Sequence, residues 1–162
     1  MNNSKVKSLS IGALMMAAVF VVTTYIQVPI PLGYFNVGNS VIILFCLFFR
    51  HPYAIVASSL GSGLADLLTY PVYTIPTVLI KAAFPLLFFF LLKKLKGRKL
   101  SVIIAAAVST LIPLFGYTLT GAFLYGGLAA GIAQFPGLLL EYAANLVIIA
   151  ALSEPVKRIG RL

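Results

Sequence analysis

The chain has 162 residues, of which 61% are apolar and only 9% are charged, and its mean hydropathy is +1.07. Soluble domains contain about 45–50% apolar and about 25% charged residues, so these values exclude a water-exposed globule and indicate an integral membrane protein. A net charge of +9 is compatible with nucleic-acid binding, but the positions of the basic residues, described below, argue against a nucleic-acid partner.

Apolar runs of spanning length follow one another along the whole chain. They predict helices over residues 8–28, 37–49, 53–69, 72–92, 101–125 and 132–152. Proline, glycine or charged residues separate the runs, at 29–33, 50–52, 70–71, 93–99 and 126–131. We therefore expect an all-α, polytopic six-helix bundle that forms a single transmembrane domain over residues 1–162, with no separate soluble domain.

The basic residues test this six-span arrangement. All 12 Lys and Arg residues except Lys81 lie before the first run, in the second or fourth connection, or after the last run. The connections near residues 29–36, 70–75 and 126–131 contain neither Lys nor Arg. With six spans the basic positions all fall on one side of the membrane, and the positive-inside rule then places both termini in the cytoplasm.

Three ionisable residues lie inside apolar runs, where charge is costly and usually marks a site or a pathway. Asp66 and Lys81 are expected at similar depth near the outer ends of adjacent helices, where they can form a structural ion pair or contact a ligand. Glu141 lies nine residues into the sixth run, close to the midplane. Its carboxyl group is expected to be protonated, to be paired, or to meet a polar ligand.

Other polar and aromatic groups gather at the outer ends of the predicted helices. These candidate substrate-binding residues are Tyr34, Asn36, Asn39, Lys81, Tyr117, Tyr125, Gln134 and Glu141. Tyrosines at such depths commonly form an aromatic belt, and that alternative applies to each of them. Their concentration on the outer side nevertheless favours an outward-opening pocket, with aromatic rings that stack on a flat ligand and amides that bind its edge.

Catalysis is poorly supported by the residue inventory. The single His51 lies in a connection without a second ligand nearby, so no catalytic group and no metal site are predicted. No phosphate-binding G-x-x-x-x-G-K-[ST] motif is present, so the chain is not expected to hydrolyse nucleotides or to need a cofactor.

Small residues at four-residue spacing allow helix backbones to approach closely. Ala13 and Ala17 have this spacing in the first run, and Ala57, Gly61 and Ala65 extend it in the third. Ordinary packing within the chain explains either stripe equally well.

Four segments resemble the substrate-capture (S) subunits of energy-coupling factor (ECF) vitamin transporters. They are GYFNVGN at residues 33–39, LGSGLADL at 60–67, TVLIK at 77–81 and LYG at 124–126, in the family's order and spacing. The resemblance covers nearly the whole chain and is greatest to the branch for hydroxymethylpyrimidine, a thiamine precursor, or pyridoxine-like rings. It implies a multi-pass protein of a prokaryotic plasma membrane that binds a vitamin near its outer face.

The resemblance also implies partners: a membrane coupling (T) subunit and two cytoplasmic ATPase subunits. Ala13 and Ala17 match the family's docking pattern on the first helix, and the pocket is implied to lie between the first outer loop and the fourth to sixth helices. Asn39 stands where the family often has Asp, and Gly121 where it often has Glu, which makes this pocket less acidic. The alternative function is a self-sufficient small carrier or channel that works as a homo-oligomer.

Overall fold

The computed structural model describes residues 3–48, 52–95 and 100–159, and this part of the chain is mostly helical, as predicted. In chain order the elements are α1 (Asn3–Tyr25), β1 (Gln27–Ile30), β2 (Gly33–Asn36), α2 (Gly38–Phe48), α3 (Tyr53–Thr69), the 3₁₀ helix η1 (Pro71–Tyr73), α4 (Thr74–Lys94), α5 (Ser101–Ser109), α6 (Leu111–Leu124) and α7 (Leu128–Ile159). Of the basic residues behind the topology prediction, Arg50, Lys96, Arg98, Lys99 and Arg161 lie outside the described residues, as does His51.

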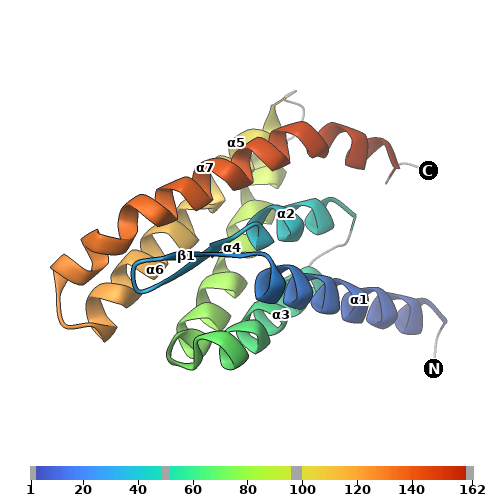
Figure 1. The fold of residues 1–162 in the computed structure, drawn as a ribbon. Helices are drawn as coiled ribbons and strands as arrows, with labels where there is room; N and C mark the ends of the chain where they lie inside the picture. Colours follow the sequence, from blue (N-terminus) through green and yellow to red (C-terminus); the bar gives the residue numbers. More distant parts are fainter. Residues whose placement is uncertain (1–2, 49–51, 96–99, 160–162) are drawn as a thin grey trace.

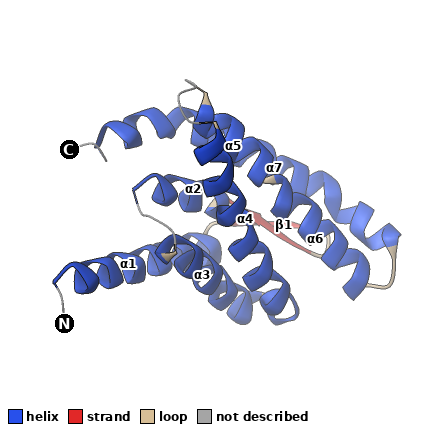
Figure 2. Cartoon of the chain, turned by 180° about the vertical axis from the view of Figure 1, so that it is seen from behind, coloured by secondary structure: helices blue, strands red, loops and turns tan. Residues whose placement is uncertain are grey.

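Four helical stretches of the described chain are long and apolar enough to cross a membrane. They are Ser8–Tyr25, Pro71–Lys94, Ser101–Leu124 and Leu128–Val156, whereas α2 and α3 are shorter apolar helices. Figure 1 shows both termini at one end of the molecule and the turns α3–α4 and α6–α7 at the other. Figure 2 shows the same arrangement from behind.

The segment after the first helix forms a β-hairpin, which the sequence analysis did not predict. Helix α1 ends at Tyr25, so Gln27 and Val28, expected to be helical, belong to β1. The two strands are antiparallel, with Gln27 opposite Asn36, and Leu32 in the turn has a φ of 61°. A bulky residue is rare in this left-handed region, so the turn is strained.

An isolated two-stranded hairpin is barely stable, so this one depends on its contacts with the helices. One such contact is with α7, where a Cβ added to Gly137 would lie 2.6 Å from Cγ2 of Ile30. The absent side chain at Gly137 therefore makes room for the hairpin. As Figure 1 shows, the hairpin crosses the middle of the bundle between α1 and the α6–α7 pair.

The predicted fifth span is interrupted between α5 and α6 at Thr110. Pro113 has no N–H to donate to the carbonyl of Ser109, four residues earlier, and this loss favours a break there. The sixth helix begins earlier than expected, at Leu128, because Gly131 does not form a turn. A Cβ at Gly131 would lie 2.7 Å from the Thr118 carbonyl oxygen, so this glycine instead lets α7 approach α6 closely.

The small-residue stripe of α3 packs against α1. Ala57, Gly61 and Ala65 are all buried, and a Cβ added to Gly61 would lie 2.7 Å from the Met16 carbonyl oxygen. By contrast, Ala13 and Ala17 are exposed on α1. The two stripes therefore have different environments despite the same spacing.

An apolar core fills the half of the bundle nearer the termini. It brings together side chains of α1, α2, α4, α5 and α7, among them Met15, Ile42, Phe84, Phe88, Val102 and Ile149. The buried polar side chains of α4, Thr77 and Lys81, lie earlier in the same helix and on the hairpin side. The polar side chains of α4 that could contribute to a functional site therefore lie in the half of the bundle beside the hairpin.

Candidate functional site

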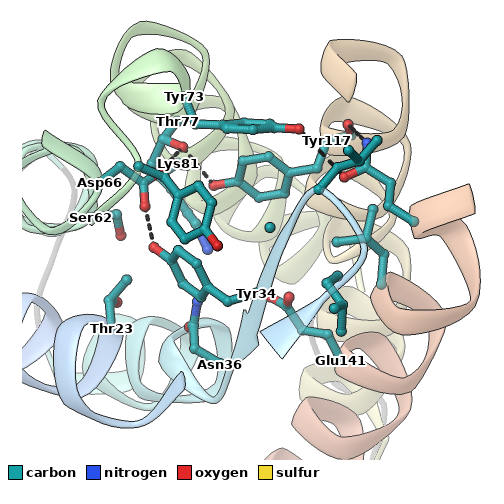
Figure 3. Close-up of a pocket in the computed structure, with 16 residues that line it drawn as sticks. Thr23, Tyr34, Asn36, Ser62, Asp66, Tyr73, Thr77, Lys81, Tyr117 and Glu141 are labelled. Atoms are coloured by element: carbon teal, nitrogen blue, oxygen red, sulfur yellow. Dashed lines mark hydrogen bonds between the residues drawn. The ribbon is translucent and has the colours of Figure 1, made fainter. Parts of the chain in front are cut away.

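A cavity, partly open to solvent, lies between the hairpin and helices α1, α3, α4, α6 and α7 (Figure 3). Its lining residues are Thr23, Ile30, Leu32, Gly33, Tyr34, Asn36, Ser62, Asp66, Tyr70, Tyr73, Thr77, Lys81, Tyr117, Gln134, Leu138 and Glu141. The lining combines aromatic faces with a few polar groups, which is typical of a ligand site.

Lys81 and Glu141 are connected through Asn39. The Lys81 Nζ donates to Asn39 Oδ1 at 2.6 Å, and Asn39 Nδ2 donates to Glu141 Oε1 at 2.7 Å. The amide accepts from the ammonium and donates to the carboxylate at once, whereas an ionised aspartate at position 39 would have no donor for Glu141. An asparagine at position 39 thus fits the two groups that it connects.

Asn145 fixes the junction between the hairpin and α2. Its Nδ2 donates to the Asn36 carbonyl at 2.9 Å, and its Oδ1 accepts from the backbone N–H of Ser40 at 2.6 Å. The Asn36 side chain in turn accepts from the N–H of Gly38 at 2.7 Å. These buried bonds hold the start of α2, and with it Asn39, in place against α7.

Asp66 joins the hairpin to α3 and α4. Its carboxylate accepts hydrogen bonds from the hydroxyl groups of Tyr34 and Thr77. Burial, together with the neighbouring Asp66 carboxyl group, raises the pKa of the Tyr34 phenol above its ordinary range. The phenol consequently remains protonated and keeps donating to Asp66.

These contacts are found in place of the direct ion pair that was expected between Asp66 and Lys81. Both side chains line the same cavity, but in the described structure the carboxylate binds two hydroxyl groups and the ammonium binds the Asn39 amide. Tyr34 and Thr77 each donate to one oxygen of Asp66, whereas Lys81 donates to Asn39. The two charges interact across the cavity rather than through contact.

Aromatic rings lie around these polar groups of the cavity. The rings of Tyr34 and Tyr70 lie 5.4 Å apart, and those of Tyr73 and Tyr117 lie 6.2 Å apart. Lys81 Nζ lies 5.7 Å from the centre of the Tyr117 ring, within cation–π range. A flat ligand entering the cavity would therefore meet ring faces as well as charged groups.

Gln134 shows why a small residue is needed at position 121. A Cβ on Gly121 would lie only 1.6 Å from the Gln134 Nε2, which donates to the Tyr117 carbonyl at 2.8 Å. Any larger residue at 121 would displace Gln134 from the cavity wall. Gly121 thus makes room for the neutral amide of Gln134 at this place.

The structure brings most of the predicted substrate-binding residues together. Those that line the cavity are Tyr34, Asn36, Lys81, Tyr117, Gln134 and Glu141. Asn39 lies behind the lining, in hydrogen-bond contact with it. Tyr125 does not line this cavity; it is 41% exposed, with its ring 6.3 Å from that of Tyr73.

Thr23, Ser62 and Thr77 line the cavity without having been predicted as ligand contacts. A helical spacing could have indicated two of them, since Ser62 precedes Asp66 by four residues and Thr77 precedes Lys81 by four. Residues four apart lie on one helix face, so each hydroxyl shares the face of a charged residue. Thr23 has no such neighbour in the sequence.

The lining carries two carboxyl groups, Asp66 and Glu141, and one ammonium group, Lys81. When all three are ionised, the formal charge of the site is therefore negative, which favours neutral or cationic ligands. No group of three or more His, Cys, Asp or Glu residues that could hold a metal ion occurs in the described parts of the chain.

Comparison with known proteins agrees with this architecture. Residues 3–158 match the family described as ECF-type riboflavin transporter, S component. An uncharacterised Pyrococcus woesei protein from a gap 3′ region is 28% identical over 148 residues, which cover 88% of this chain and 97% of that protein. A solved S component of a bacterial ECF transporter has a TM-score of 0.76 at 19% identity, over 96% of this chain and 98% of that one, and so shares its fold. Because the family match spans nearly the whole chain, the resemblance seen in the sequence is confirmed at family level, and the protein belongs to the ECF-type riboflavin transporter S components.

Proposed function

We propose that the chain captures a small heteroaromatic vitamin or vitamin precursor outside the cell and delivers it through a separate energised module. The observation that carries this proposal is the cavity under the hairpin, in which tyrosine rings face the connected side chains of Lys81, Asn39 and Glu141. A single ring of the hydroxymethylpyrimidine or pyridoxine type is the proposed ligand. Its nitrogen atoms and substituents can exchange hydrogen bonds with an ammonium and a carboxyl group while its faces stack on tyrosine.

Riboflavin, which the family's name mentions, is the competing ligand and has a larger three-ring system. Two features support the smaller ring. The hairpin places Ile30 and Leu32 in the cavity wall, and Gln134 fills the space beside Gly121. Both narrow the space available to a flat ligand.

The proposed partners are a membrane coupling subunit and two cytoplasmic ATPase subunits, since the chain has no nucleotide-binding motif of its own. The proposed docking face is the exposed pair Ala13 and Ala17 on α1. Beside Ala17 lies an apolar groove whose other lining residues are Met16, Phe20, Leu64, Leu67 and Leu68. A partner helix could approach α1 closely at these two alanines. In this role the chain catalyses no reaction.

The proposed setting is the plasma membrane of a prokaryote, with six spans and both termini in the cytoplasm. The location of both termini at one end of the bundle supports this orientation. So do Lys93 and Lys94, which are exposed in the last turn of α4. In this orientation the hairpin and the cavity face outward.

Equilibrium binding to the purified chain tests the ligand. The chain has no tryptophan, so its eight tyrosines dominate the ultraviolet emission, and a ring stacked on them should quench it. Hydroxymethylpyrimidine or pyridoxine is expected to bind more tightly than riboflavin. Tighter binding of riboflavin would overturn the single-ring assignment, and no binding of any of the three would overturn the proposed function.

Uptake by proteoliposomes that contain the chain alone separates a capture subunit from a self-sufficient carrier. We expect ligand binding without concentration inside the vesicles, because the energy source resides in the partners. Concentrative uptake driven by an ion gradient, without any ATPase, would instead support the homo-oligomeric carrier.

A further inference from the structure

Buried hydroxyl groups on the helices of this protein usually donate back to a carbonyl of their own helix. Ser58, Ser59 and Ser109 do so at 3.0, 3.2 and 3.2 Å. Such bonds, to the carbonyl three or four residues earlier, are the ordinary way to satisfy a hydroxyl in an apolar setting. A buried hydroxyl without one requires another explanation, because an unsatisfied buried polar atom destabilises the fold.

Two hydroxyl groups in the cavity lack any such bond. Thr23 is 2% exposed and Ser62 is 0% exposed, and both line the cavity. Their Oγ atoms are buried and have no hydrogen-bond partner among residues 3–48, 52–95 and 100–159. The two hydroxyls are thus available to a molecule inside the cavity.

The two residues lie on the same side of the site. Figure 3 shows Thr23 and Ser62 near one another on the α1–α3 wall, with Glu141 on the opposite side of the cavity. Lys81 and Asn36 lie between these two sides in the same view. The α1–α3 wall is therefore separate from the Lys81–Asn39–Glu141 connection on which the proposed function rests.

From this geometry we infer that Thr23 and Ser62 form a second polar subsite, which binds a hydroxyl group on a substituent of the ligand ring. This inference rests on the proposed function and deepens it, since it states which substituent the ligand carries. The ring stacks on the tyrosines, its edge meets Lys81 and Glu141, and its hydroxyl-bearing arm reaches the α1–α3 wall.

The chemistry of the wall favours a neutral hydroxyl over a charged group. Each side-chain hydroxyl can donate one hydrogen bond and accept others, and a ligand hydroxyl has the same capacity. Asp66 lies one helical turn from Ser62, so its negative charge would repel a carboxylate or phosphate arm. Asp66 already accepts hydrogen bonds from Tyr34 and Thr77, which reduces its capacity to attract an ammonium arm.

The test compares ligand pairs that differ in the hydroxyl-bearing arm. The pairs are hydroxymethylpyrimidine with its 5-methyl analogue, pyridoxine with 4-deoxypyridoxine, and riboflavin with lumiflavin. The pair whose hydroxylated member binds the wild-type chain is then used to measure ligand affinity for the Ser62→Ala and Thr23→Val variants. The matched controls are Thr24→Val and Thr74→Val, whose buried hydroxyls also lack a partner in the described chain but do not line the cavity.

We expect the wild-type chain to prefer the hydroxylated ligand by about 3- to 10-fold, the effect of one neutral hydrogen bond. In Ser62→Ala and in Thr23→Val the ratio of the two affinities should fall toward one, while the affinity for the methyl analogue stays unchanged. Thr24→Val and Thr74→Val should preserve the preference, and Thr23→Ser, which retains the hydroxyl, should preserve it as well.

The two proposals fail in different ways. If the wild-type chain binds none of the hydroxylated ligands, the proposed function fails, and the subsite with it. If it binds one but shows no preference, or if Ser62→Ala and Thr23→Val keep the full preference or weaken both ligands equally, the subsite alone is overturned. Retained affinity for the methyl analogue shows that a variant is folded.

Discussion

Helix α4 has one buried face, and its two halves differ in chemistry. Thr77 and Lys81 occupy the half beside the hairpin, whereas Phe84 and Phe88 occupy the half nearer the termini, and all four are at most 1% exposed. Their spacing of four, three and four residues places them on the same side of the helix. The change from polar to apolar within this one face separates the wall of the cavity from the apolar core of the bundle.

The largest expected effect comes from the apolar half. Phe88→Ala should lower the free energy of unfolding by about 3–5 kcal/mol, because it leaves a cavity among fully buried neighbours. Ligand affinity should remain unchanged in the folded fraction. Thermal unfolding in detergent measures the first quantity and titration the second, with Phe90→Ala as control because Phe90 is 53% exposed on the same helix. Weaker ligand binding to folded Phe88→Ala protein would show that the two halves are not independent.

The next effect comes from the charges of the polar half. Lys81→Met should cost about 2–3 kcal/mol of stability, below the cost of breaking a dry ion pair, because the cavity can admit water. Asp66→Asn should cost less, since its hydroxyl partners can still donate to the amide oxygen. The two charges face one cavity without direct contact, so the double variant should be only slightly more stable than the sum of the single effects predicts.

A double-mutant cycle on unfolding midpoints measures this coupling. A coupling energy as large as the single effects would indicate a direct pair in the membrane and contradict the arrangement in which Lys81 binds Asn39 rather than Asp66.

A smaller effect, and one confined to ligand binding, is expected at Glu141. The change Glu141→Gln preserves shape and removes the charge, so ligand affinity should fall by about 1–3 kcal/mol while the fold stays intact. Glu154→Gln, at an exposed position later in α7, is the control. Unchanged affinity in folded Glu141→Gln protein would limit Glu141 to its structural bond with Asn39.

The same contrast explains how far the sequence could predict the site. Charged groups are costly in lipid, so the ionisable residues inside the apolar runs drew attention to Lys81 and Glu141, and both line the cavity. The hairpin was missed because its four-residue strands have no periodicity long enough to distinguish from a turn. The cavity role of Thr23 was missed because isolated hydroxyls are common in membrane helices, and only the absence of its usual backbone bond sets it apart.

The hydrogen-bond partners of the charged groups could not be predicted from the sequence either. Similar depth suggested that Asp66 would pair with Lys81, but depth along the membrane does not specify which side chains face each other across the bundle. That choice depends on the hairpin, which brings Tyr34 to Asp66, and on α2, which brings Asn39 between Lys81 and Glu141. Both elements are positioned by contacts between residues far apart in the sequence.

The smallest expected effect on the chain itself is on the surface of α1, where Ala13 and Ala17 are exposed. Ala13→Trp and Ala17→Trp should leave stability and ligand affinity nearly unchanged, because neither side chain contributes to the buried core. Transport by the assembled importer should nevertheless fall strongly, since a close helix contact does not tolerate a large side chain. Ala57→Trp, in the buried stripe of α3, should instead prevent folding, which distinguishes the two stripes that the sequence spacing could not.

Ala143→Trp, at an exposed position of α7, controls for bulk added to the surface elsewhere. The measurement compares ligand binding by the isolated chain with ATP-dependent uptake by the complete importer. Wild-type uptake by both α1 variants would place the docking face elsewhere on the chain. Weaker binding by the isolated variants would show that this surface of α1 affects the cavity, whose wall includes Thr23 from the same helix.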